Sequence, residues 1–192
     1  MKFRFILSFA LLLLSLTCLG EGSERAYGVR VFDQTGAPNA IVSFYTDNPS
    51  YIVEEYPLEG LTVRAAAYAN GAYYLMIAPS YTCDSLVRVD MATGQRQTVA
   101  VYRLKKDLAV RLIVTDMTYD SSTAQFYALA VDVEGVDTQN PDAEVNLNLY
   151  TIDPATGEAK LVGGQAAVNL VTIAADANGY LYGVDTNGTL CR

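Results

Sequence analysis

Histidine is absent from this chain of 192 residues. Histidine is the usual general base near neutral pH and the commonest metal ligand, so its absence removes both roles at once. Catalysis by a Ser-His-Asp or a Cys-His arrangement is therefore excluded within this chain. Together with the lack of any nucleophile motif, this absence leads us to expect a protein that is not an enzyme.

Cysteine is scarce, with Cys18, Cys83 and Cys191 as its only occurrences. Two or three cysteines in a chain of this size do not make a disulfide framework. Cys18 falls in the N-terminal apolar segment described next. Cys83 and Cys191 either pair in an oxidising compartment or remain thiols.

The sequence also lacks an apolar run long enough to span a bilayer. Its longest run, from Phe5 to Leu16, is shorter than the roughly 20 residues that a membrane helix needs. Lys2 and Arg4 precede the run and small residues follow it near Gly20, which is the layout of a secretory signal peptide. We therefore expect residues 1–20 to be removed and residues 21–192 to be exported without a transmembrane segment.

The destination of the exported chain stays open between the periplasm, the cell surface and the extracellular space. Cys18 offers a second route, because a cysteine at the end of an apolar run can carry the lipid of a bacterial lipoprotein. Ser15, Leu16 and Thr17 fit that signal poorly, since a small residue is usual just before the cysteine. A lipid anchor is the alternative to a freely soluble mature chain.

Positive charge is in short supply. The full chain has 13 Lys and Arg against 21 Asp and Glu, and removal of the signal with Lys2 and Arg4 leaves 11 against 21, a net charge of −10. A protein that binds a phosphate backbone needs a positive footprint. Nucleic acid is therefore not an expected partner.

What the sequence does contain is a repeated turn. Short runs rich in Val, Ile, Tyr, Phe and Thr are interrupted by Gly, Asn, Asp and Pro, which predicts an all-β chain. Three of the interruptions place an Asp shortly before Thr-Gly, and each lies between two predicted strands: Asp33 to Gly36, Asp90 to Gly94 and Asp153 to Gly157. We interpret all six residues as structural, with Asp accepting backbone N–H bonds and Gly supplying φ > 0.

A second type of predicted hairpin alternates with the first. It begins at Val63, Val114 and Val171, and its turns are residues 69–71, 120–122 and 177–179, of which two contain the hairpin signal Asn-Gly. The two types together make a unit of four strands with a period near 50 residues. Four-stranded antiparallel sheets repeated at such a period are the blades of a β-propeller.

The repeats divide residues 21–192 into about three blades. We assign a partial blade to 27–57 with one hairpin, full blades to 62–102 and 112–163, and a partial blade to 170–192. Closed propellers usually have four to eight blades. We expect an incomplete ring from a longer propeller. Alternatively, the terminal halves pair into one blade, which closes a very small ring or forms a dimer. Open strand edges would favour self-association.

The segments that carry the repeat also carry a family resemblance. The stretches are LYTIDPATGEAKLVG from Leu149 and LVTIAADANGYLYGVD from Leu170. This alternation resembles secreted β-propeller proteins of Bacteroidetes-type bacteria and, more broadly, Kelch-, NHL- and quinoprotein-type propellers. The resemblance covers nearly all of residues 27–192. It implies an exported module that binds a protein or a glycan, and it brings no catalytic motif.

An acidic segment, residues 131–146, is the candidate metal site. Asp132, Glu134, Asp137 and Asp142 offer the hard oxygen ligands that Ca²⁺ takes, although their spacing does not match an EF-hand loop. The alternative interpretation is a solvated insertion between two strands. A calcium site here would support the second functional hypothesis, a glycan-active or calcium-dependent enzyme remnant; otherwise no cofactor is expected.

Tyrosine is abundant, with 14 occurrences. Tyr74, Tyr127 and Tyr182 occupy matching places in the repeat, which favours a packing role. The tyrosines nearer turns and strand ends are better ligand candidates: Tyr45, Tyr51, Tyr56, Tyr81 and Tyr119.

Overall fold

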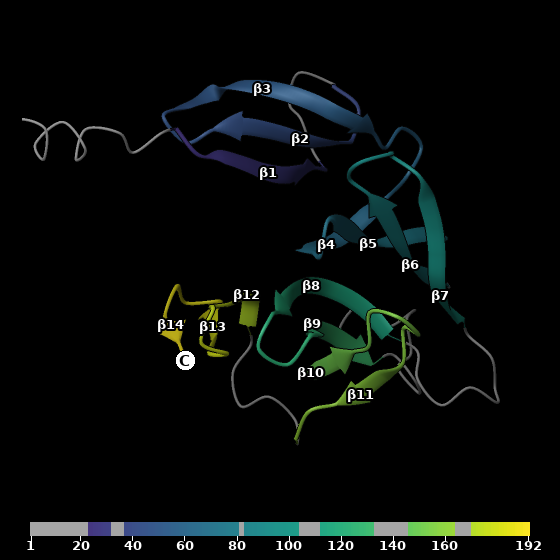
Figure 1. The fold of residues 1–192 in the computed structure, drawn as a ribbon. Helices are drawn as coiled ribbons and strands as arrows, with labels where there is room; N and C mark the ends of the chain where they lie inside the picture. The colour runs from purple at the N-terminus through teal and green to yellow at the C-terminus, as the bar shows by residue number, and fades with distance from the viewer. Residues whose placement is uncertain (1–22, 32–36, 81–82, 104–111, 133–145, 164–169) are drawn as a thin grey trace, which may run out of the picture. The chain divides into compact units, whose positions relative to one another are not determined.

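The computed structural model describes residues 23–31, 37–80, 83–103, 112–132, 146–163 and 170–192 (Figure 1). These residues form fourteen strands in four antiparallel sheets, with no helix among them, so the all-β prediction is confirmed. No helix in this part of the chain has the length and apolar character needed to cross a membrane. The chain divides after Leu58 into two compact units, and each is described by itself.

The first unit is a three-stranded sheet of β1 (Arg25–Arg30), β2 (Ala40–Tyr45) and β3 (Asn48–Pro57), in that order. The repeat predicted only one hairpin over residues 27–57, and that strand count is wrong because β3 adds a third strand. The pairing of β3 with β2 shifts register at two places. These irregularities break the alternation of apolar and polar residues by which a strand is recognised from sequence.

The second unit contains three sheets, each a meander in which consecutive strands pair. The first consists of β4 (Val63–Ala69), β5 (Ala72–Ser80), β6 (Cys83–Asp90) and β7 (Arg96–Arg103). The second consists of β8 (Leu112–Asp120), β9 (Gln125–Asp132), β10 (Asn146–Ile152) and β11 (Ala159–Leu161). The third consists of β12 (Leu170–Ala175), β13 (Leu181–Asp185) and β14 (Leu190–Cys191).

The strand register of the three meanders agrees with the repeat alignment. Two residues after the matching tyrosines Tyr74, Tyr127 and Tyr182, the second strand of each sheet faces a leucine of the third strand. The pairs are Met76 with Leu86, Leu129 with Leu149 and Val184 with Leu190. The first strand of each sheet also has a register shift at one shared place, between residues 63 and 65, 114 and 116, and 170 and 172.

The core of the second unit lies between the sheets β4–β7 and β8–β11. Strand β4 contributes Ala65, Ala67 and Ala69, whose small side chains let β8 lie beside it. Across this interface the rings of Tyr74 and Phe126 lie 4.7 Å apart between centroids. Burial of a large apolar side chain contributes roughly 1.5–3 kcal/mol, so this face accounts for much of the stability of the unit.

Candidate functional site

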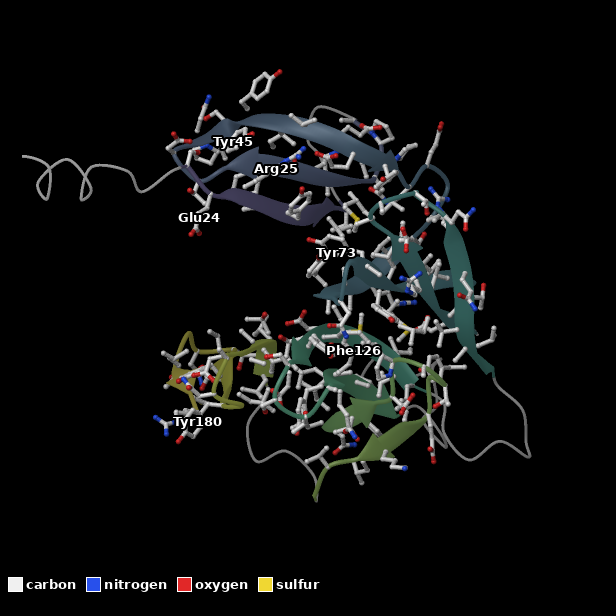
Figure 2. The ribbon with its side chains drawn as sticks, in the orientation of Figure 1. Glu24, Arg25, Tyr45, Tyr73, Phe126 and Tyr180 are labelled. Atoms are coloured by element: carbon white, nitrogen blue, oxygen red, sulfur yellow. The ribbon has the colours of Figure 1, made fainter. Side chains whose placement is uncertain are left out.

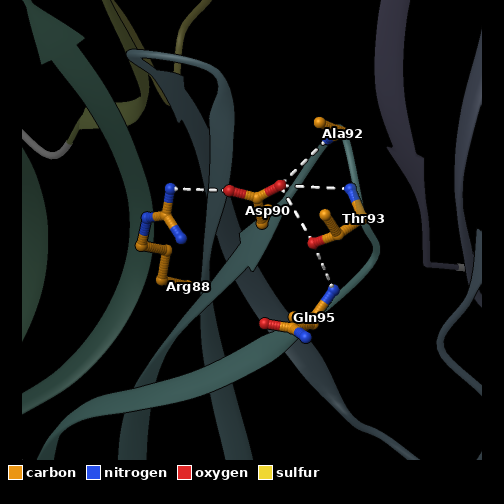
Figure 3. A network of polar contacts seen from close by, with 5 residues as sticks. All are labelled: Arg88, Asp90, Ala92, Thr93 and Gln95. Atoms are coloured by element: carbon orange, nitrogen blue, oxygen red, sulfur yellow. Dashed lines mark hydrogen bonds and ion pairs between the residues drawn. The ribbon is translucent and has the colours of Figure 1, made fainter.

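The turn that begins at Asp90 is built around that residue's carboxylate (Figure 3). Its Oδ1 accepts hydrogen bonds from the backbone N–H groups of Ala92 and Thr93, each at 3.1 Å, and from the Thr93 hydroxyl at 3.0 Å. Its Oδ2 accepts one from the Arg88 guanidinium at 3.0 Å. The bonds from Arg88 and Thr93 lower the pKa of Asp90.

The turn that begins at Asp153 repeats this arrangement. Oδ1 of Asp153 accepts from the N–H groups of Ala155 and Thr156 at 2.8 Å and from the Thr156 hydroxyl at 3.1 Å. The two backbone bonds lower the pKa of Asp153. Gly94 and Gly157 have φ of 71° and 72°, the left-handed region that favours glycine. Both carboxylates are thus engaged by their own turns, whereas Asp33 and Gly36 lie outside the described residues.

Position 157 requires glycine for a second reason, because its turn contacts the neighbouring sheet β4–β7. A Cβ atom added at this position would overlap the Cβ of Ala100 on β7. The hydroxyl of Tyr102, also on β7, donates a hydrogen bond of 2.7 Å to the Gly157 carbonyl. Burial raises the pKa of Tyr102 well above its usual value. The turn therefore fastens β8–β11 to β4–β7, a contact that the sequence pattern did not reveal.

Three further aspartates begin turns in the same way; the turn at Asp120 was predicted from the sequence, whereas Asp176 and Asp185 were not singled out. Each accepts a backbone N–H from the residue two positions ahead, at 2.8 Å: Asp120 from Ser122, Asp176 from Asn178 and Asp185 from Asn187. An Asp before a turn favours this conformation. Carboxylates of the repeat are therefore used mainly to shape turns.

A polar contact joins the second and third sheets. Oδ2 of Asp116 on β8 accepts from the Thr172 hydroxyl at 2.6 Å and from the Ile173 N–H at 2.8 Å, both on β12. The Thr118 hydroxyl accepts from the Ala175 N–H at 3.1 Å. These side chains satisfy amides on the edge of β12, where β8 lies beside it. We call this contact the Asp116 latch.

Asp84 on β6 is a buried charged group at the contact between β4–β7 and β8–β11, with 4% of its surface exposed. It forms an ion pair with Arg64 on β4 at 3.3 Å and accepts a hydrogen bond from the Val114 N–H on β8. Burial raises the pKa of Asp84, and the Arg64 charge partly offsets that effect.

The candidate metal ligands are mostly beyond what the structure describes. The backbone of Asp132 ends β9, opposite Leu112 and Asn146. Glu134, Asp137 and Asp142 lie outside the described residues, so calcium binding by this segment stays a prediction. Within the described ranges, no three Asp, Glu or Cys residues are grouped so that they could hold a metal ion. Cys191 is a free thiol, and the side chain of Cys83 lies outside what the structure describes.

The tyrosines proposed as ligand contacts divide into two kinds. Tyr45 and Tyr51 are 47% and 65% exposed. Tyr119 instead has a packing role, because its hydroxyl accepts from the Asn70 side chain at 3.1 Å and its ring lies 5.2 Å from that of Phe126. Tyr56 is half-buried, and Tyr81 lies outside the described residues.

The exposed tyrosines of the first unit include two that share one sheet face with an arginine. Arg25 pairs directly with Tyr45 across β1 and β2 (Figure 2). Tyr27 lies two residues further along β1. The Arg25 guanidinium lies 5.2 Å from the Tyr27 ring centroid. It also donates to the Ser43 hydroxyl at 3.1 Å and forms an ion pair with Glu55. We call Arg25, Tyr27 and Tyr45 the Arg25 surface.

Successive four-stranded meanders whose first strands lie side by side are the construction of a β-propeller. Comparison with solved structures agrees. The protein in the "Crystal structure of Nidogen/Laminin Complex" is matched with TM-score 0.54 and 11% identity, over 86% of this chain and 54% of the other. TolB from Acinetobacter baumannii is matched with TM-score 0.53 and 13% identity, over 94% and 44%.

A third match is a protein of unknown function from Bacteroides thetaiotaomicron, with TM-score 0.55 and 15% identity over 84% of this chain and 39% of the other. No family model and no curated protein matches the sequence. The neighbours show the propeller fold, while bacterial origin and secretion stay predictions. The chain spans about half or less of the length of these three proteins.

Proposed function

We propose that this protein is an exported, non-enzymatic module that binds a protein partner through the Arg25 surface. The observation that carries the proposal is the pairing of exposed tyrosines with an arginine whose position is already fixed. Tyr27 and Tyr45 are 42% and 47% exposed, and they flank Arg25 on one face of the sheet. Tyrosine and arginine are enriched among the residues that dominate protein–protein binding energies.

Preorganisation strengthens this reading. Arg25 contacts the Ser43 hydroxyl, the Glu55 carboxylate and the Tyr27 ring. A side chain that is already ordered loses less conformational entropy on binding, and each immobilised long side chain otherwise costs about 0.5–1.5 kcal/mol. The surface is therefore suited to recognition without rearrangement.

The structural neighbours are consistent with a binding role. One of them was solved in a complex of nidogen with laminin, which are both proteins. Similarity of fold does not by itself identify a partner. The specific support for a protein partner is therefore the Arg25 surface. The alternative, a glycan-active or calcium-dependent enzyme, depends on the acidic segment of residues 131–146, of which the structure does not describe residues 133–145.

Site-specific photo-crosslinking tests the proposal. A photoreactive phenylalanine analogue would replace Tyr45 in one variant and Tyr68 in another, because Tyr68 is 52% exposed but belongs to the second unit. We expect the variant at position 45 to capture one discrete protein from the native cell-envelope or culture fraction, and Arg25→Ala to abolish that product. Capture that is equal at positions 45 and 68, or that survives Arg25→Ala, would contradict the proposal.

A further inference from the structure

Three turns of the second unit contain the dipeptide Asn-Gly: Asn70-Gly71, Asn178-Gly179 and Asn187-Gly188. In this dipeptide the glycine amide nitrogen can attack the asparagine side-chain carbonyl, since glycine has no side chain to hinder the approach. The three pairs share the same reacting atoms and differ in sequence only in their flanking residues. A difference in reactivity that disappears on unfolding therefore comes from the fold.

Hydrogen bonding separates the three glycine amides. The N–H of Gly179 donates to the Asp176 carbonyl at 3.2 Å, and the N–H of Gly188 donates to the Asp185 carbonyl at 3.0 Å. In the part of the chain that the structure describes, the Gly71 N–H donates to no backbone carbonyl. An amide that is already donating must give up its hydrogen bond before its nitrogen can react, and this loss slows the reaction.

Access to the turn sets Gly179 apart from the other two glycines. A Cβ placed on Gly179 would lie 2.5 Å from the Ser122 hydroxyl oxygen, so this turn is packed against its neighbour. The corresponding positions at Gly71 and Gly188 have no atom within 4 Å. Asn70 and Gly71 are both exposed, so water reaches this turn. Only Gly71 combines an open position with an amide that has no backbone acceptor.

We propose that Asn70 is a site of spontaneous modification, at which water converts the side-chain amide to a carboxylate. The Gly71 nitrogen attacks Cγ of Asn70 and forms a five-membered ring, and the Cγ–Nδ2 bond breaks. Nδ2 takes up the proton lost by the Gly71 nitrogen and leaves as ammonia. Water then adds to one of the two carbonyl groups of the resulting ring. Opening of the ring gives aspartate or isoaspartate, and no oxidant or reductant takes part.

The modification changes a contact between two sheets. Nδ2 of Asn70 donates a hydrogen bond of 3.1 Å to the Tyr119 hydroxyl on β8, and this donor is lost with the ammonia. Isoaspartate also inserts one carbon into the main chain of a two-residue turn, where Ala69 and Ala72 pair directly. The conversion therefore weakens both the β4–β5 hairpin and its attachment to the next sheet.

Peptide mapping by mass spectrometry tests this proposal on the full chain. The folded protein would be incubated in mildly alkaline buffer, where amide attack is faster, and each Asn-Gly peptide would be followed for the mass change from NH₂ to OH. We expect conversion in the order Asn70, then Asn187, then Asn178. Asn70→Gln is the site control, because glutamine would have to form a larger ring and should react far more slowly. This variant should lose the mass change at residue 70 and keep those at Asn178 and Asn187.

The same incubation in concentrated urea separates fold from sequence. Without the turns, the three Asn-Gly pairs should convert at similar rates. Conversion of Asn178 or Asn187 at least as fast as that of Asn70 in the folded chain would overturn the proposal. An unchanged order in urea would also overturn it, because the order would then not depend on the structure.

Discussion

Single residues of the repeat are constrained mainly by turn geometry and by close approach between sheets. Asp90 and Asp153 accept the same set of backbone and threonine donors, and the glycine that ends each turn has positive φ. A carboxylate that recurs with the same partners shapes the backbone. A catalytic carboxylate would need to occur only once.

Gly157 is predicted to tolerate even alanine poorly. Gly157→Ala adds the strain of a non-glycine residue at φ 72° and also an overlap with Ala100 on β7. We expect a loss of about 1–3 kcal/mol in the free energy of unfolding, measured by urea denaturation. Gly60→Ala is the matched control, because Gly60 has φ of 75° but no atom within 4 Å of the added Cβ. Equal losses in the two variants would show that the overlap with Ala100 has no energetic weight.

The free energy of unfolding at acidic pH should depend on the carboxylate of the Asp153 turn. The folded pKa of Asp153 is lowered from 3.8, so its contribution is present above that value and is lost as the pH falls through the folded pKa. Asp153→Asn keeps an oxygen acceptor but cannot titrate. We expect the wild type to be more stable than the variant above about pH 4, by a margin that shrinks with acidification. Urea denaturation at several pH values measures the margin, and a constant margin would contradict the prediction.

Whole strands contribute contacts that depend on pairing between distant segments. The Asp116 latch joins β8 to β12, which lie more than fifty residues apart in sequence. Because β12 is the first strand of its sheet, amides on its outer edge need acceptors from β8. The latch supplies these acceptors from side chains.

Removal of the latch should loosen the third sheet selectively. We expect Asp116→Ala to increase the hydrogen-exchange rate of the Ile173 amide and its neighbours in β12, with little change in β5 or β6. Thr115→Ala is the matched control on the same strand, because the Thr115 hydroxyl donates within its own sheet to the Leu129 carbonyl. Exchange that is unchanged in Asp116→Ala, or equally raised by Thr115→Ala, would argue against the latch.

The repeat, the strand order of the second unit and the turn residues could be predicted from sequence, because Asp, Gly and Tyr recur at fixed spacing. Strand β3 could not, since its two register shifts against β2 remove the alternation that identifies a strand. Tyr45 was named as a ligand candidate, but its grouping with Arg25 and Tyr27 was missed, and so was the Asp116 latch. Both depend on cross-strand or cross-sheet neighbours, such as Arg25 opposite Tyr45, which a single sequence does not specify.

At the scale of the second unit, the two interfaces between sheets differ in chemistry. The interface of β4–β7 with β8–β11 is lined by alanines and aromatic rings. The interface of β8–β11 with β12–β14 contains hydrogen bonds that Asp116 and Thr118 accept from β12. The first interface combines apolar burial with hydrogen bonds such as the one from Tyr102 to Gly157, whereas the contacts described at the second are hydrogen bonds accepted by Asp116 and Thr118.

This difference bears on which sheet can follow which along the chain. In the shared register, Ala65 of β4 occupies the position that Asp116 has in β8, since they face Met76 and Leu129 respectively. A shuffled chain that placed β12–β14 directly after β4–β7 would leave the Ile173 amide facing a methyl group. The first strand of a sheet therefore helps to select the sheet that follows. The repeats share one strand plan, but β8 carries an acceptor for β12 at a position where β4 has Ala65.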